Sequence, residues 1–192
     1  MFYKIYPNDD YSCRTAYYQT GFLHYLLNQY LGKIWGGEKL LVPLNHMLNN
    51  MDEANQALHN HEIKAGEIVI IRYLGPKASY DSAYWFTSQL KGSDLYTKVA
   101  VITDGCLSGA ASGASFQFAA PEAALNSPLA AVRNGDIIEY DIHARTMNVE
   151  LTDEEIQQRI SELTGNEYPH FTGYLGIYQK GCISISKGAV LR

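Results

Sequence analysis

The sequence predicts a mixed α/β fold, in which helices cover a sheet that is not purely parallel. Two almost uninterrupted apolar runs, 67–73 and 98–103, are typical of strands that are buried on both faces. A helical pattern over 80–90 lies between them. Two short apolar segments, 136–142 and 147–151, flank a polar tip and predict an antiparallel hairpin.

The first third of the chain is less regular. Residues 1–20 are polar and aromatic, whereas 21–31 is apolar nearly all round, so that periodicity does not separate a buried helix from strands there. Residues 39–44 form a short strand candidate. Asp52 is expected to cap a helix that runs to about His59.

The second half alternates between short strands and helices. Residues 115–119 are a candidate third strand, and Pro121 suits the first turn of a short helix. Thr152 and Glu155 have the spacing of a capping box, which predicts a helix from there to about Leu163.

Composition narrows the class of protein. Of the 192 residues, 46% are hydrophobic and 18% are charged, which is typical of a globular chain. The net charge of -5 argues against nucleic-acid binding, which needs clustered basic residues. No apolar run is long enough for a membrane span, and the first residues lack an apolar signal core. We therefore expect no membrane partner and a cytoplasmic location.

Three cysteines are widely separated in the sequence: Cys13, Cys106 and Cys182. They form no CxxC pair, so neither a zinc site nor a disulfide framework is indicated. Three cysteines could in principle hold an iron–sulfur cluster, although three separate reduced thiols are the favoured interpretation.

Six segments form an ordered series in the chain. They are IRYLGPK (71–77), ITDGCLSG (102–109), APEAA (120–124), GDII with the DIHARTMN that follows (135–148), DEE (153–155), and GYLGIY with GAVL (173–178 and 188–191). In this order they resemble the carboxy-terminal domain of the dehydratase family that includes dihydroxy-acid dehydratase and 6-phosphogluconate dehydratase.

The resemblance implies a fold and a domain division. The expected fold is α/β mixed, a β-barrel-like swivelling β/β/α domain flanked by helices. Residues 51–192 would be the dehydratase-family carboxy-terminal domain. Residues 1–50 would be a divergent aromatic-rich arm or a shortened start of the same domain.

The family dehydrates 2,3-dihydroxy acids or sugar acids to 2-keto acids, which requires a base at carbon 2 and a Lewis acid for the leaving hydroxyl. The resemblance assigns the base to Ser108 and substrate binding to Asp104, Gly105 and Gly109. It also implies an iron–sulfur cluster and a divalent metal, held mostly by an amino-terminal domain. We therefore expect no cofactor and no metal ligand in this chain. A serine beside glycine in a loop is, however, more often simple turn chemistry.

Departures from the family pattern concentrate in polar positions. Leu74 stands where the family has a metal-binding glutamate, and leucine cannot bind a hard cation. Cys106 replaces an arginine, and Gln117-Phe118 replaces Gly-His. This pattern fits a retained fold with a lost site, and it also fits altered substrate contacts.

Two functions remain open. The first is the carboxy-terminal domain of a hydro-lyase, inactive alone, in a homo-oligomer or with a partner chain that carries the missing domain. The second is a non-catalytic binding or interaction module that kept the fold, which Leu74 favours. An exposed apolar face would need a cover, and the aromatic-rich arm suits such a contact.

Overall fold

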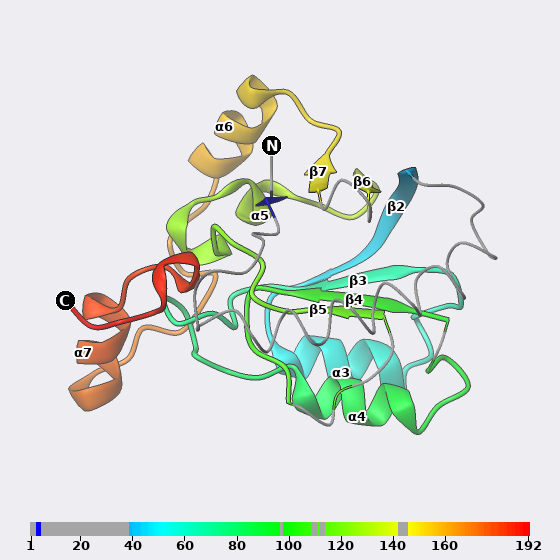
Figure 1. Ribbon diagram of the computed structural model, residues 1–192, viewed down its shortest axis with the longest axis horizontal. Coiled ribbons are helices and arrows are strands. Elements are labelled where there is room, and N and C mark those ends of the chain that lie inside the picture. The colour runs from blue at the N-terminus through cyan, green and yellow to red at the C-terminus, as the bar shows by residue number, and fades with distance from the viewer. Residues whose placement is uncertain (1–2, 5–38, 97, 109–110, 112–113, 142–145) are drawn as a thin grey trace.

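The structure, a computed structural model, describes residues 3–4, 39–96, 98–108, 111, 114–141 and 146–192 (Figure 1). Its strands are β1 (Tyr3–Lys4), β2 (Lys39–Leu48), β3 (Ile68–Ile71), β4 (Ala100–Thr103), β5 (Ala114–Phe116), β6 (Ile137–Asp141) and β7 (Thr146–Val149). Its helices are α3 (Met51–His59), α4 (Tyr84–Lys91), α5 (Pro128–Ala131), α6 (Asp153–Ser161) and α7 (Gly173–Gly181), with 3-10 turns η3 (Ala123–Leu125) and η4 (Ile185–Lys187).

The strands form one sheet in the order β1-β7-β6-β2-β3-β4-β5. Strand β2 joins its two wings, an antiparallel wing with β1, β7 and β6 and a parallel wing with β3, β4 and β5. Residues 39–43 of β2 pair antiparallel with β6, and residues 44–48 pair parallel with β3 after a register shift. Strands β6 and β7 consequently curl away from β3, β4 and β5 (Figure 1). The result is a half-barrel flanked by helices, which confirms the predicted mixed, barrel-like fold.

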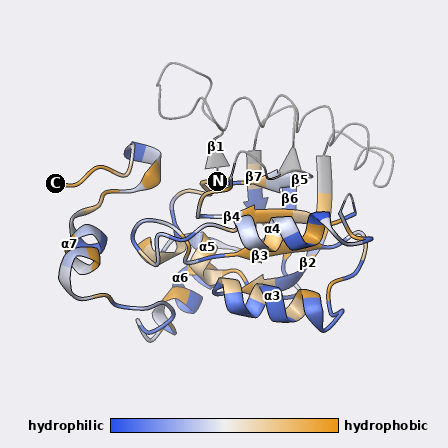
Figure 2. Ribbon diagram, turned by 90° about the horizontal axis from the view of Figure 1, so that it is seen from below, coloured by the Kyte–Doolittle hydropathy of each residue, from blue (hydrophilic) through white to orange (hydrophobic). Residues whose placement is uncertain are grey.

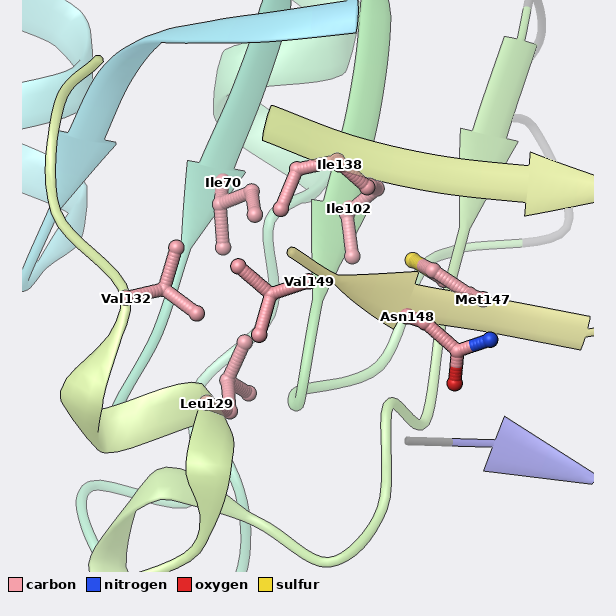
Figure 3. A pocket seen from close by; sticks show the side chains of 8 residues that line it. All are labelled: Ile70, Ile102, Leu129, Val132, Ile138, Met147, Asn148 and Val149. Atoms are coloured by element: carbon pink, nitrogen blue, oxygen red, sulfur yellow. The ribbon is translucent and has the colours of Figure 1, made fainter. Parts of the chain in front are cut away.

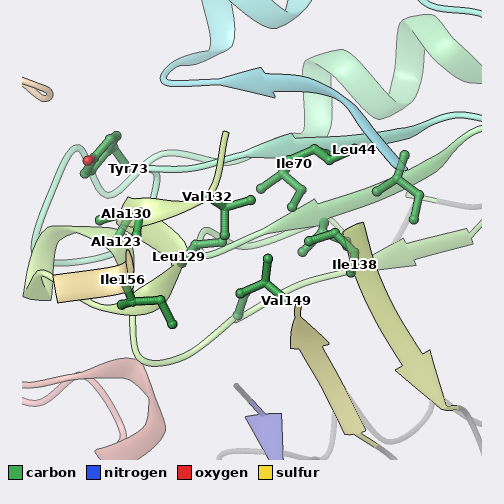
Figure 4. Close-up of a cluster of buried hydrophobic side chains, with 14 of the residues drawn as sticks. Leu44, Ile70, Tyr73, Ala123, Leu129, Ala130, Val132, Ile138, Val149 and Ile156 are labelled. Carbon is green, nitrogen blue, oxygen red and sulfur yellow. The ribbon is translucent and has the colours of Figure 1, made fainter. Parts of the chain in front are cut away.

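The apolar run at β3 contributes to two hydrophobic clusters of the described residues, because successive side chains of a strand point to opposite faces. Ile68 and Ile70 enter the cluster between the two wings, together with Leu129, Ile138 and Val149 (Figure 4). A cavity of about 10 Å³ in this cluster is lined mostly by apolar side chains (Figure 3) and is at the lower limit for one water molecule.

The opposite face of β3 and β4 is covered by α3 and α4, which lie side by side in Figures 1 and 2. Val69 and Ile71 face these helices, where Ala54 and Phe86 are completely buried. Each buried aliphatic side chain contributes roughly 1.5–3 kcal/mol. The parallel wing is thus fixed from both sides.

The helix starts agree with the sequence only in part. The capping box of Thr152 and Glu155 at α6 is confirmed. Helix α3, however, is capped by the Asn50 side chain, which accepts from the Glu53 amide, and not by Asp52. The short turn expected at Pro121 begins two residues later, at Ala123.

The predicted arm falls mostly outside the described residues. Of it, β1 pairs with β7, and β2 is a central strand of the sheet. The domain boundary at residues 50/51 stays a prediction. Within the described part of the chain, no helix has the length and apolar character needed to cross a membrane.

Candidate functional site

Strands β2, β3 and β4 run parallel, so their carboxyl ends meet at one edge of the sheet. The segments 72–83 and 104–108 leave β3 and β4 at this edge and carry the residues that the sequence singled out. Ligands of open α/β sheets usually bind at such an edge. We therefore consider this edge the candidate functional site.

Asp104 is fully buried at the end of β4. Its Oδ2 accepts hydrogen bonds from the amides of Tyr73 and Ala123, both at 3.1 Å, and its Oδ1 accepts from the Leu74 amide at 2.9 Å. The carboxylate therefore joins three segments that are distant in the sequence. Its predicted substrate-binding role stays a prediction, but both oxygens already have partners within the protein.

Burial raises the pKa of Asp104 from 3.8 to about 6, because the charged form loses hydration. The three backbone hydrogen bonds lower the pKa and limit this rise, whereas the negative charge of Glu122 adds to it. Asp104 is thus mainly ionised at pH 7, and its charge is stabilised by the three amides and attracts the nearby Arg72 guanidinium.

Position 105 has no room for a side chain, so glycine is required there. A Cβ atom there would lie 2.5 Å from the Leu74 Cβ and 2.9 Å from the Asp81 carbonyl oxygen. The amide of Gly105 donates to Thr103 Oγ1, and its carbonyl accepts from the Phe118 amide. Gly105 therefore lets two loops approach closely. Gly109, the other predicted substrate-binding glycine, lies outside the described residues.

Ser108, the predicted base, is half-buried in the loop that follows β4. The neighbouring Leu107 amide donates to Gln117 Oε1 at 2.8 Å, and the Ser108 carbonyl accepts from the Ala111 amide at 2.9 Å. Gln117 thus fixes the backbone beside the serine. The sequence indicated Gln117 only as a departure from glycine, so its positioning contact was not predicted.

Leu74 lies next to this loop and is 2% exposed. It packs in the cluster that includes Ala83, Phe86 and Leu107. The position that the resemblance assigns to a metal-binding glutamate is therefore an apolar contact within the core of this chain.

The residues present do not fit the metal and cluster that the resemblance implies. Asp104 uses both oxygens for amides, and Leu74 offers no donor atom. Among the residues that the structure describes, no three His, Cys, Asp or Glu side chains form a group that could hold a metal ion. Cys106 is exposed and Cys182 is buried, and both are free thiols, while Cys13 lies outside the described residues.

Comparison with known proteins gives a consistent result. A family model described as "Dihydroxy-acid/6-phosphogluconate dehydratase C-terminal" matches residues 44–189. The dihydroxy-acid dehydratase of Halothermothrix orenii is 43% identical over 142 residues, which are 73% of this chain and 26% of that protein. That of Methanobrevibacter smithii is 40% identical over 148 residues, 76% of this chain and 27% of that protein. The chain thus spans about a quarter of the length of these curated relatives.

The Asp104 contacts predict a stability effect. Asp104→Asn should lower the free energy of unfolding at pH 7 by about 1–3 kcal/mol, because the amide nitrogen cannot accept a backbone hydrogen bond. Urea unfolding measures this change. The exposed Asp94→Asn should change it by less than about 0.5 kcal/mol. Equal effects of the two substitutions would contradict the assignment.

The unfolding free energies of the native chain and of Asp104→Asn should also depend differently on pH. Because the folded pKa of Asp104 exceeds its ordinary value of 3.8, its contribution to stability is fully present below pH 3.8 and is lost as the pH rises through about 6. The difference in unfolding free energy between the native chain and Asp104→Asn should therefore increase, by up to about 3 kcal/mol, from pH 7 to pH 4. A difference that shrinks on acidification would show that the pKa is lowered instead.

Proposed function

The chain belongs to the family of dihydroxy-acid/6-phosphogluconate dehydratase carboxy-terminal domains, and from this premise we propose that it is the carboxy-terminal part of a hydro-lyase. The substrate would be a 2,3-dihydroxy acid or a sugar acid. The proposal rests mainly on the Ser108 loop, which lies at the carboxyl edge of the parallel strands and is fixed by Gln117.

The proposed reaction removes one water molecule. The Ser108 alkoxide would take the proton from carbon 2 while the hydroxyl group leaves carbon 3. The departing hydroxide would then receive that proton and be released as water, and the resulting enol would tautomerise to the 2-keto acid. A serine hydroxyl is a weak base unless its alkoxide is stabilised. In this proposal residues beyond these 192 complete the site, so the chain alone is inactive.

A second function is favoured by one observation, the burial of Leu74 in the core. A chain that has replaced a metal-binding carboxylate by a packed leucine is suited to a non-catalytic role. We propose this as the alternative: a binding or interaction module that kept the dehydratase fold.

A partner is also part of the proposal, as either a second copy or a chain that carries the missing domain. Helix α7 and the tail after it expose large apolar side chains, namely Tyr174, Leu175, Ile177, Val190 and Leu191. Clustered apolar exposure of this kind typically marks an interaction surface. A cytoplasmic location completes the proposal.

Activity measurements test the proposed chemistry. The purified chain should form no 2-keto acid from 2,3-dihydroxy acids or sugar acids. Mixed with the amino-terminal part of the Halothermothrix orenii relative, it should gain activity that Ser108→Ala lowers by about 100-fold or more, while Ser161→Ala is a matched control. Ser108-dependent turnover by the chain alone would contradict the proposal. An inactive mixture that Leu74→Glu leaves inactive would favour the non-catalytic alternative.

Light scattering tests the proposed partner surface. We expect the purified chain to form a homodimer or larger assembly. Ile177→Glu should shift it toward the monomer, because a charge on an apolar contact must be desolvated. Asp153→Lys, a charge change on α6, is the control. A strictly monomeric native chain would exclude self-association.

A further inference from the structure

A groove outside the Ser108 loop lies between residues 168–172, helix α7 and the loop after β3. Its volume is about 410 Å³, within the range of roughly 300–1,000 Å³ that is usual for small-molecule sites. None of the residues 104–108 lines it. The groove is therefore a candidate site separate from the one already described.

Positive charge distinguishes this groove. Lys77 and Lys180 line it together with His170, whose Nε2 donates to the Gly165 carbonyl at 2.7 Å, and no described residue of its lining is acidic. The chain as a whole has 20 acidic residues against 15 lysines and arginines. Basic groups have therefore gathered in a hollow of an acidic protein, which favours an anionic ligand.

Gln179, which is 8% exposed, holds the walls of the groove in place before any ligand binds. Its Nε2 donates to the carbonyls of Ala78 and Pro169 at 2.7 and 2.9 Å, and its Oε1 accepts from the Phe171 amide at 3.2 Å. One side chain thus joins three of the segments that line the groove, and Ala124 of the turn η3 lines it as well. Such preorganisation lowers the entropic cost of binding a ligand.

Lys77 adds a second link, since its Nζ donates to the Lys180 carbonyl at 2.9 Å. An ammonium group has three N–H donors, so two remain after this bond. The Tyr168 ring, which forms an aromatic wall beside it, is also held in place. It stacks on the ring of buried Tyr73, with 5.3 Å between the ring centroids, and its centroid lies 5.1 Å from that of the His170 ring. The groove thus combines one positioned ammonium group, that of Lys77, with flat apolar surface.

The amino terminus of α7 contributes a further attraction for anions. Thr172 lines the groove and is the N-cap residue of this helix, yet its side chain makes no capping hydrogen bond. Free amides and the helix dipole favour negative charge at such an end. This contribution adds to the two lysines and would not define a site without them.

We propose that the groove binds a small organic anion, with its carboxylate or phosphate group at Lys77 and Lys180 and its carbon chain against Tyr168 and Phe171. The inference goes beyond the proposed hydro-lyase function and does not depend on it. It assigns a ligand class to a part of the molecule that the Ser108 chemistry does not use.

Titration calorimetry on the full chain at constant ionic strength tests the proposal with three probes. Gluconate carries a carboxylate without phosphate, glucose 6-phosphate carries a phosphate without carboxylate, and sorbitol is the neutral control. Saturable binding of either anion, without binding of sorbitol, is the expected result. The anion that binds identifies the group. Absence of saturable binding for both would overturn the proposal.

Substitutions locate the binding. Lys77→Gln and Lys180→Gln should each weaken it about 5-fold or more, whereas Lys91→Gln, an exposed lysine on α4 outside the groove, should change it by less than about 2-fold. An equal loss in all three variants would mean diffuse surface attraction and would contradict a built site. Because no turnover is measured, failure here leaves the hydro-lyase proposal intact.

Discussion

One buried carboxylate organises the functional edge of this protein. Asp104 binds the amides of Tyr73, Leu74 and Ala123, so the loops after β3 and β4 and the turn η3 are held as one unit. Its burial is costly for a charge, and the three hydrogen bonds offset part of that cost. The close contact of Gly105 with Leu74 depends on this arrangement. Glu122, beside Ala123, extends it to the tail by accepting from Ser184 Oγ and the Ile185 amide.

The Asp104 hydrogen bonds also explain how the fold can be kept while the residues of the site change. Asp104 and Gly105 serve the fold through backbone contacts, so they are needed whatever the site does. Leu74 has only to pack, and it does so in the cluster that includes Leu107, the neighbour of Ser108. Family membership is therefore stronger evidence for the fold of this chain than for its catalytic activity. The anion groove is supported by the same loops, since Lys77 and Ala124 follow Leu74 and Ala123 closely.

The sequence predicted what local patterns encode and missed what tertiary contacts decide. The apolar runs at β3 and β4 and the capping box at Thr152 were read correctly, because strand burial and helix capping depend on neighbours in the sequence. The three amide partners of Asp104 were not predicted, because such contacts are not visible in a linear pattern, and its substrate-binding role stays a prediction. The groove was missed for the same reason: its lysines at 77 and 180 are brought together only by folding.

Amide hydrogen exchange tests most directly whether the Asp104 contacts form the structural centre of the site. If they do, the amides of Tyr73, Leu74 and Ala123 exchange only through global unfolding, with the same free energy of opening as the core amides of β3 and β4. All three should also lose this protection together in Asp104→Asn. Exchange of the three amides in the native chain as rapid as that of exposed loops would contradict the account.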